Sequence, residues 1–164
     1  MTTVVANLEA MAADHRCTSE GPICHVKKIY RLTVDGEERL YGLCGEVMMA
    51  LYVIEWLQGK RDKEALHKAI GIEQRANIAL LELSHDGLAL IDGWGMRMPL
   101  LDRCYAIGSG AGAAIVSLRR GAELRDCIRD AAAIDEASGT HPDFPPELEY
   151  LTPKELTPKR RRGK

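Results

Sequence analysis

The sequence has few aromatic residues and no long apolar run. Aromatic residues make up 5% of the chain, so we expect a core of Ala, Val, Ile, Leu and Met. No run of about 18 apolar residues exists, which excludes a membrane-spanning helix. The amino terminus lacks a basic region followed by an apolar core, so we expect no secretory signal. The five cysteines have no C-x-x-C spacing, which argues against a disulfide framework and favours a reduced, cytoplasmic protein.

What is present is an ordinary globular composition with an uneven charge. The 164 residues are 46% hydrophobic and 28% charged, which predicts one domain. The segment 153–164 holds six Lys/Arg and one Glu, a net charge of +5, so the remainder carries −7 of the total of −2. We therefore expect a domain over residues 1–152 and a basic, disordered tail over 153–164. A weak attraction of this tail for nucleic acid or an acidic partner is the alternative, and nucleic-acid binding is not the function we expect.

The first residues combine two reactive groups. Methionine aminopeptidase can remove Met1 when a small side chain follows, and Thr2 is such a residue. The mature chain then begins with a threonine that carries both a hydroxyl nucleophile and a free α-amine. Such an amine has a pKa of about 7.7–8.0, which suits proton transfer near neutral pH. One residue can thus supply nucleophile and base together.

Apolar periodicity and turn residues predict a mixed α and β fold. Strands are predicted over 2–8, 10–14, 26–34, 39–43, 77–83, 88–92 and 104–107, with a further strand over 143–151. Helices are predicted over 46–57, 62–70, 111–120 and 123–137. Asp35-Gly36 and His85-Asp86-Gly87 are hairpin turns. Because the strands gather in antiparallel hairpins with helices between them, we expect an α+β fold of layered αββα architecture.

Six stretches, in order, carry a resemblance to a known family. They are Thr2-Thr3-Val4-Val5, Ala12-Ala13-Asp14, Val26-Lys27-Lys28-Ile29, Gly42-Leu43-Cys44-Gly45, Ala106-Ile107-Gly108-Ser109-Gly110 and Asp135-Glu136-Ala137-Ser138-Gly139. In this order they resemble the proteasome β-subunit family of N-terminal nucleophile hydrolases, and most of all its bacterial HslV type. The resemblance covers about residues 2–140 and implies a four-layer αββα sandwich with antiparallel sheets.

The resemblance implies a threonine endopeptidase site. Thr2 would be the nucleophile, with its α-amine as the base acting through a water. Asp14 and Lys28 would form the charged pair beneath it, since a nearby ammonium keeps the amine unprotonated. Gly45 would supply the N–H of the oxyanion hole. The supporting polar residues would be Ser109, Asp135 and Ser138.

The resemblance also implies how the enzyme is organised. Leu43 and Val47 match the specificity pocket, which predicts a preference for an apolar substrate side chain; both residues are otherwise core positions. The chain would assemble into stacked homo-oligomeric rings and receive peptides or unfolded proteins from a separate AAA+ ATPase of the HslU type. No cofactor and no metal are implied. Because no G-x-x-x-x-G-K-[ST] motif occurs, the chain supplies no P-loop ATPase of its own.

The sequence departs from the family pattern in several places. The hairpin over 2–14 and the region 46–77 are shorter than usual. Glu46 stands where a small residue or Asp is common. The basic tail has no counterpart in the family. These departures affect the expected docking of an ATPase more than they affect the expected site.

Three other interpretations remain. The segment Gly108–Ala113 fits G-x-G-x-x-A, a variant of the dinucleotide-binding motif, but Asp130 lies inside a predicted helix rather than at the end of a second strand. A metal site from His15, Cys17, Cys24 and His25 has no standard zinc spacing. Finally, a chain that retains Met1 would lack a free amine at Thr2 and would be an inactive ring or scaffold subunit.

Overall fold

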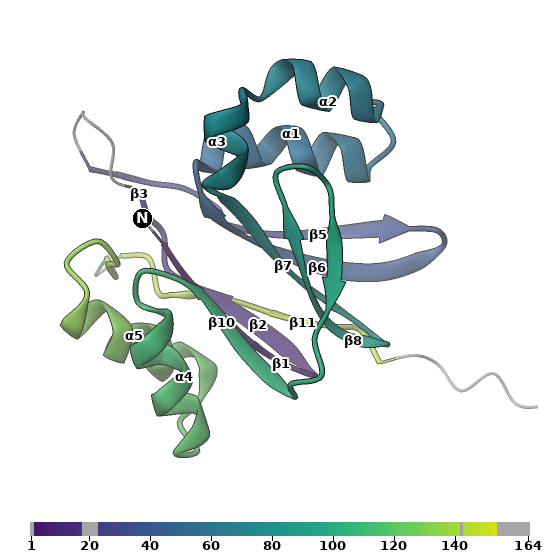
Figure 1. Ribbon diagram of the computed structural model, residues 1–164. Helices are drawn as coiled ribbons and strands as arrows, with labels where there is room; N and C mark the ends of the chain where they lie inside the picture. The colour runs from purple at the N-terminus through teal and green to yellow at the C-terminus, as the bar shows by residue number, and fades with distance from the viewer. Residues whose placement is uncertain (1, 18–22, 142, 154–164) are drawn as a thin grey trace, which may run out of the picture.

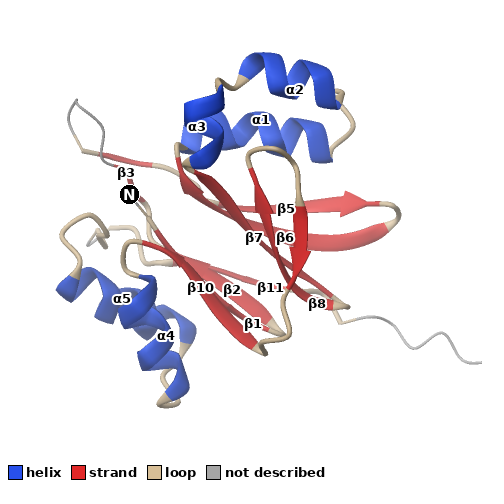
Figure 2. Ribbon diagram, viewed as in Figure 1, coloured by secondary structure: helices blue, strands red, loops and turns tan. Residues whose placement is uncertain are grey.

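The computed structural model describes residues 2–17, 23–141 and 143–153, apart from the side chains of residues 47 and 48. The chain folds into four layers, with two antiparallel sheets stacked between two layers of helices (Figures 1 and 2). The predicted α+β, αββα architecture is therefore confirmed. The tail beyond residue 153 lies outside the described part. Among the described residues, no helix has the length and the apolar character that a bilayer span requires.

The first sheet has the strand order β10-β1-β2-β11. Its strands are β10 (Cys104–Gly108), β1 (Thr3–Asn7), β2 (Ala10–Ala13) and β11 (Glu147–Tyr150). β1 and β2 form a tight hairpin in which Val4 pairs with Ala13, so Asp14 returns beside the start of β1. Glu147 pairs with Ala13 on the other side of β2. The register therefore gathers the beginning of β1, the end of β2 and the beginning of β11 at one end of this sheet.

The second sheet has the order β5-β6-β7-β8-β9. Its strands are β5 (Ile29–Val34), β6 (Glu37–Gly45), β7 (Ile78–Ser84), β8 (Gly87–Asp92) and β9 (Arg97–Pro99). The predicted Asp35-Gly36 turn joins β5 to β6, and both residues have the positive φ that a tight hairpin of this hand requires. A separate two-stranded pair is formed by β3 (Arg16–Cys17) and β4 (Cys24–His25).

Helices cover the outer face of each sheet (Figure 1). They are α1 (Val47–Leu57), α2 (Lys63–Ala69) and α3 (Ile72–Ala76) on the second sheet, and α4 (Ala111–Arg119) and α5 (Leu124–Ile134) on the first. In α5 the buried residues are Leu124, Cys127, Ile128 and Ala131, the spacing that puts one face of a helix on a sheet. The Asp62 carboxylate caps α2 by accepting the backbone N–H of Ala65.

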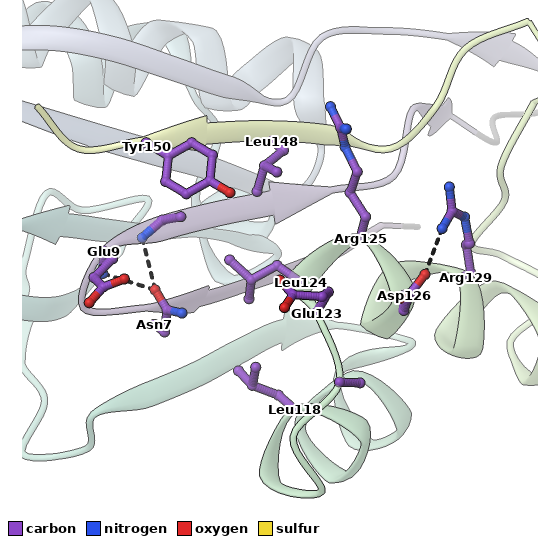
Figure 3. A pocket seen from close by; sticks show the side chains of 12 residues that line it. Asn7, Glu9, Leu118, Glu123, Leu124, Arg125, Asp126, Arg129, Leu148 and Tyr150 are labelled. Atoms are coloured by element: carbon purple, nitrogen blue, oxygen red, sulfur yellow. Dashed lines mark hydrogen bonds and ion pairs between the residues drawn. The ribbon is translucent and has the colours of Figure 1, made fainter.

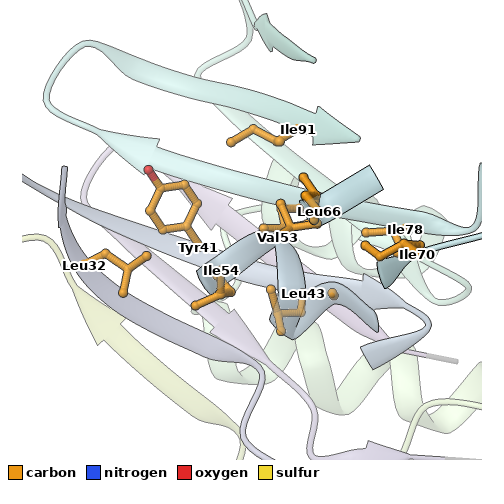
Figure 4. Close-up of a cluster of buried hydrophobic side chains, with 11 residues drawn as sticks. Leu32, Tyr41, Leu43, Val53, Ile54, Leu66, Ile70, Ile78 and Ile91 are labelled. Carbon is orange, nitrogen blue, oxygen red and sulfur yellow. The ribbon is translucent and has the colours of Figure 1, made fainter. Parts of the chain in front are cut away.

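Three apolar clusters fill the spaces between the four layers. Figure 4 shows the cluster between the second sheet and its helices, where Leu43 and Tyr41 of β6 meet Ile54 and Val53 of α1. A second cluster lies between the two sheets, and a third lies between the first sheet and α4 and α5. As expected from the composition, the three clusters consist largely of aliphatic side chains.

Several predicted element boundaries were wrong. The strand predicted over 26–34 begins only at Ile29, and the helix predicted over 123–137 ends at Ile134. At Asp135 the backbone is extended and its side chain accepts the N–H of Ala137, which ends the helix. The loop predicted around Pro99 contains β9, an edge strand, where a proline is tolerated. α3 was not predicted at all.

Candidate active site

Thr2 lies directly before β1 and is 1% exposed. The backbone N–H of Ser109 donates to the Thr2 carbonyl oxygen at 3.0 Å, which ties the start of β1 to the end of β10. The hydroxyl oxygen of Thr2 is buried and has no hydrogen-bond partner among the described residues. A buried hydroxyl left without a partner costs about 1–3 kcal/mol. The position of this hydroxyl is therefore not explained by folding stability.

Asp14 binds three segments that are far apart in the sequence. It follows β2 and is fully buried. Its Oδ1 accepts the backbone N–H of Thr3 at 2.8 Å and a proton from Lys28 Nζ at 2.8 Å, and its Oδ2 accepts the backbone N–H of Gly139 at 3.2 Å. In return, the backbone N–H of Asp14 donates to the Thr3 carbonyl at 3.1 Å. The carboxylate is thus fixed beside the amino-terminal end of β1.

Lys28 is also fully buried, and its ammonium has two acceptors. Nζ donates to Asp14 Oδ1 and, at 2.5 Å, to the carbonyl oxygen of Arg16. An ammonium has three N–H donors, so one remains beyond these two. Lys27 is exposed instead, with its Nζ 5.9 Å from the ring centroid of Tyr30. The ion pair between Asp14 and Lys28 is present, and its catalytic role stays a prediction.

The three predicted supporting residues form one hydrogen-bonded network. The hydroxyls of Ser109 and Ser138 both donate to Asp135 Oδ2, at 2.5 and 2.6 Å. The Ser138 hydroxyl also lies 2.6 Å from Thr3 Oγ1. Because Ser138 gives its proton to the carboxylate, Thr3 is the donor in this contact. Burial raises the pKa of Asp135, but the hydrogen bonds outweigh it and hold that pKa below its usual range.

Two glycines allow the strands to approach one another here. Gly45 ends β6 in an exposed position with a φ of 89°, and a Cβ on it would lie 1.6 Å from the carbonyl oxygen of Asn77. Gly108 has a φ of 100°, and a Cβ on it would lie 1.8 Å from the Thr2 carbonyl oxygen and 3.3 Å from Cys44 Sγ. Gly108 therefore marks the point where Thr2 meets the end of β6. The role of Gly45 as an oxyanion donor stays a prediction.

The structure describes the side chain of only one of the two predicted substrate-binding residues. Leu43 is fully buried in the cluster beneath α1 and α2, so it does not line an open pocket in the single chain (Figure 4). Val47 begins α1, and its side chain lies outside the described part of the structure. The preference for an apolar substrate side chain stays a prediction.

Sequence reasoning missed three participants. Thr3 binds both Asp14 and Ser138, Arg16 contributes its carbonyl oxygen, and Glu147 accepts the backbone N–H groups of Lys28 and Ile29. A hydroxyl at a buried position of β1 was a visible signal for Thr3. A backbone carbonyl has no sequence signal, and Glu147 follows its partners Lys28 and Ile29 by 119 and 118 residues.

The described part of the chain lacks the features that the two binding-site alternatives require. All pairings between the described strands are antiparallel, whereas a dinucleotide site at Gly108–Ala113 needs a parallel βαβ unit. In β3 and β4, Cys17 pairs with Cys24 and Arg16 with His25. Within the described ranges, no three His, Cys, Asp or Glu side chains are grouped so as to hold a metal.

A hollow of about 620 Å³ lies away from this site (Figure 3). It is bordered by Asn7 and Glu9 at the tip of the β1–β2 hairpin, by Tyr150 of β11, and by the beginning of α5. β1 runs from Thr3 to Asn7, and each residue of a strand advances by about 3.3 Å, so the hollow is at the opposite end of β1 from Thr2. It does not belong to the candidate active site.

Comparison with known proteins gives a clear result only at the level of structure. No protein-family model matches the sequence, and no curated protein matches it either. HslV from Trypanosoma brucei is similar with a TM-score of 0.63 and 22% identity, over 92% of this chain and 98% of that one. BPH from Thiobacillus denitrificans gives 0.64 and 19%, over 93% and 99%. An Anbu (Gly-1) mutant from Hyphomicrobium sp. strain MC1 gives 0.65 and 16%, over 90% and 80%.

Proposed function

We propose that this chain, which has the four-layer fold of HslV and other proteasome-type N-terminal nucleophile hydrolases, is a threonine peptidase subunit with Thr2 as its nucleophile. The observation that carries the proposal is the fully buried ion pair of Asp14 and Lys28, joined through Asp14 to the backbone of Thr3. The desolvation penalty of two buried charges can exceed their Coulombic attraction, so such a pair contributes little to the stability of the fold. A role in chemistry at the adjacent amino terminus accounts for it better.

The proposed reaction follows from the groups at this site. Removal of Met1 leaves Thr2 with a free amine, which takes the hydroxyl proton through a water as Oγ1 attacks the peptide carbonyl. The Lys28 ammonium disfavours protonation of that amine. The Gly45 N–H stabilises the oxyanion, and the leaving nitrogen takes the proton back from the Thr2 ammonium as the amine product departs. A water, deprotonated by the Thr2 amine, then hydrolyses the Thr2 ester and releases the acid. The Thr2 hydroxyl has no hydrogen-bond partner among the described residues, so none of these would have to be displaced when it attacks.

Peptide cleavage by the processed chain tests the proposal. The mass of the intact purified chain reports whether Met1 has been removed. The processed chain should cleave short fluorogenic peptides with an apolar side chain before the scissile bond, and Thr2→Ala should abolish cleavage without lowering the melting temperature. Full turnover by Thr2→Ala would overturn the assignment. Retention of Met1 together with no cleavage would instead favour an inactive ring or scaffold subunit.

An inhibitor gives a second test. A Thiobacillus denitrificans BPH structure is a complex with epoxomicin, and it is similar to this chain with a TM-score of 0.62. Epoxomicin is an epoxyketone and offers one electrophilic carbon to a hydroxyl and another to an amine. The processed wild type should gain the mass of one inhibitor per chain on the peptide that begins at Thr2. Chain that retains Met1 should gain none, because its amine is blocked.

We further propose that the subunit works in the cytoplasm within a ring, fed by a separate AAA+ ATPase. All five cysteines are free thiols, which suits a reducing compartment. A site inside a ring should cleave short peptides but spare folded proteins. Cleavage of a stably folded protein should therefore require an added ATPase and ATP, and efficient digestion of that protein by this chain alone would contradict the proposal.

A further inference from the structure

A second carboxylate reaches the segment that carries Lys28, and the reaction above does not use it. Glu147 is the first residue of β11, an edge strand of the first sheet. Its Oε1 accepts the backbone N–H of Lys28 at 2.7 Å, and its Oε2 accepts the backbone N–H of Ile29 at 2.9 Å. The Glu147 side chain is only 10% exposed. One half-buried carboxylate thus accepts hydrogen bonds from two consecutive backbone N–H groups, at the start of a strand of the opposite sheet.

This contact explains why β5 begins late. Consecutive N–H groups of a β-strand point to opposite sides, so two of them can bind one carboxylate only where the chain leaves strand geometry. That departure is at Lys28, and β5 accordingly begins at Ile29. The carbonyl of Lys28 still accepts the N–H of Leu43 in β6. The backbone at Lys28 is therefore held from both sides.

Lys28 is bound twice to the same end of the first sheet, once by Asp14 and once by Glu147. Glu147 pairs in register with Ala13, the neighbour of Asp14. Asp14 holds the ammonium of Lys28, and Glu147 holds its backbone. Lys28 is thereby fixed at the two ends of its side chain, and both anchors come from the end of the first sheet at which Thr2 lies.

His15 completes the surroundings of the Glu147 carboxylate. Its Nδ1 lies 3.2 Å from Glu147 Oε1 and 3.3 Å from the Val26 carbonyl oxygen, and its Nε2 lies 3.0 Å from the Pro145 carbonyl oxygen. All three neighbours can accept a hydrogen bond from the imidazole. Burial raises the pKa of Glu147, while the two backbone N–H groups oppose that shift.

We propose that Glu147 is a positioning residue that fixes the backbone of Lys28, so that the ammonium stays paired with Asp14 beside the amino terminus. This inference rests on the proposed peptidase function. It assigns Glu147 no contact with the substrate. Its effect passes through Lys28, and therefore through the protonation of the Thr2 amine.

The test compares Glu147→Gln with Glu149→Gln. A glutamine at 147 presents an NH₂ group to one of the two backbone donors and loses that hydrogen bond. We expect kcat to fall by about 10–100-fold with little change in KM, the size of effect found for residues that orient metal ligands. The acid limb of the kcat/KM profile should move to higher pH, because a displaced ammonium no longer depresses the pKa of the amine. Glu147→Asp, which keeps the charge, should recover part of the activity.

Glu149 is the matched control. It lies two residues further along β11 and binds Arg31 of β5 at 3.0 Å, so it joins the same two strands without touching Lys28. Glu149→Gln should keep kcat and the pH profile of the wild type. If both variants lose activity alike, the contact is a general one between the sheets and the positioning role is wrong.

A second measurement does not depend on activity. Acetylation by acetic anhydride, read for each lysine by mass spectrometry, should label the exposed Lys27 and spare Lys28 in the wild type. Glu147→Gln should raise labelling of Lys28 severalfold, and Glu149→Gln should not. If the processed wild type cleaves no peptide, the peptidase function fails while this labelling still decides the role of Glu147. Unchanged labelling of Lys28 in Glu147→Gln would overturn the inference.

Discussion

At the scale of single residues, the buried pair of Asp14 and Lys28 allows catalysis and stability to be measured separately. Lys28→Met leaves the Asp14 carboxylate buried without a cation, which should cost about 3–5 kcal/mol of stability and abolish peptide cleavage. Asp14→Asn combined with Lys28→Met removes both charges, so most of that stability should return while cleavage stays absent. Denaturant unfolding and peptide cleavage measure the two effects.

Lys27 is the control for this pair. Its side chain is exposed, so Lys27→Met should keep both the unfolding midpoint and the activity close to wild type. Cleavage by the double variant at the wild-type rate would show that Lys28 has no catalytic role.

The Ser109–Asp135–Ser138 network makes a prediction about pH. Its hydrogen bonds hold the folded-state pKa of Asp135 below its ordinary value of about 3.9. The ionised carboxylate therefore stabilises the folded chain at pH values above the unfolded-state pKa, and this contribution is lost as the pH falls through the lowered folded-state pKa. The melting temperature of the wild type should exceed that of Asp135→Asn at pH 7, and the difference should shrink below about pH 4. A difference that is constant with pH would contradict this.

The sequence predicted some residues of this candidate site and missed others. Thr2, Asp14, Lys28, Ser109, Asp135 and Ser138 were predicted because their short motifs occur in the order that the resemblance requires. Lys28 was chosen over Lys27 in the same way, and the structure buries only Lys28. Glu147 follows two prolines in a short strand and resembles any surface acid. Its partners are 118 and 119 positions away, and local patterns contain no information about such contacts.

At the scale of elements, the end of β6 can be tested with a pair of glycines. Gly45→Ala places a methyl group against the carbonyl oxygen of Asn77, so the strand end must shift. If the Gly45 N–H stabilises the oxyanion, kcat should fall by about 10²–10³-fold, the effect of losing one such donor. The rate of peptide cleavage under saturating substrate measures this.

Gly36→Ala is the matched control at the other end of the same strand. Gly36 also has a positive φ, of 79°, but a Cβ there would have no neighbour within 4 Å. The alanine should cost about 1–2 kcal/mol of stability for its backbone conformation and leave kcat unchanged. An equal loss of kcat in both variants would mean that backbone strain, rather than the position of the Gly45 N–H, limits the reaction.

The sequence predicted which helices and strands exist better than it predicted where each of them begins and ends. Apolar periodicity located β1, β2, β6, β7, β8 and four of the five helices, because each buries one face or both against a neighbouring layer. It failed where long-range contacts set the boundary, as at Lys28, where Glu147 takes two N–H groups from the strand. It also failed for short elements such as α3, whose five residues include none that are buried.

At the scale of the whole molecule, the single chain leaves large apolar side chains in water. Leu101 is 102% exposed, Ile134 at the end of α5 is 76% exposed, and Ile72 in α3 is 73% exposed. Assembly into stacked rings would cover part of this surface and enclose the active sites. We expect light scattering after size exclusion to give a ring-sized mass at micromolar concentration. A strictly monomeric particle would contradict the ring and the enclosed site with it.

The burial of Thr2 has a practical consequence for anyone who produces this protein. Purification tags are commonly fused ahead of the first residue, yet Thr2 is almost entirely enclosed and its carbonyl is bound to β10. A tag in front of it would convert the Thr2 amine into an amide. An affinity handle therefore belongs at the far end of the chain, after β11. If Thr2 is the nucleophile, as proposed, a preparation with a leading tag should cleave no peptide.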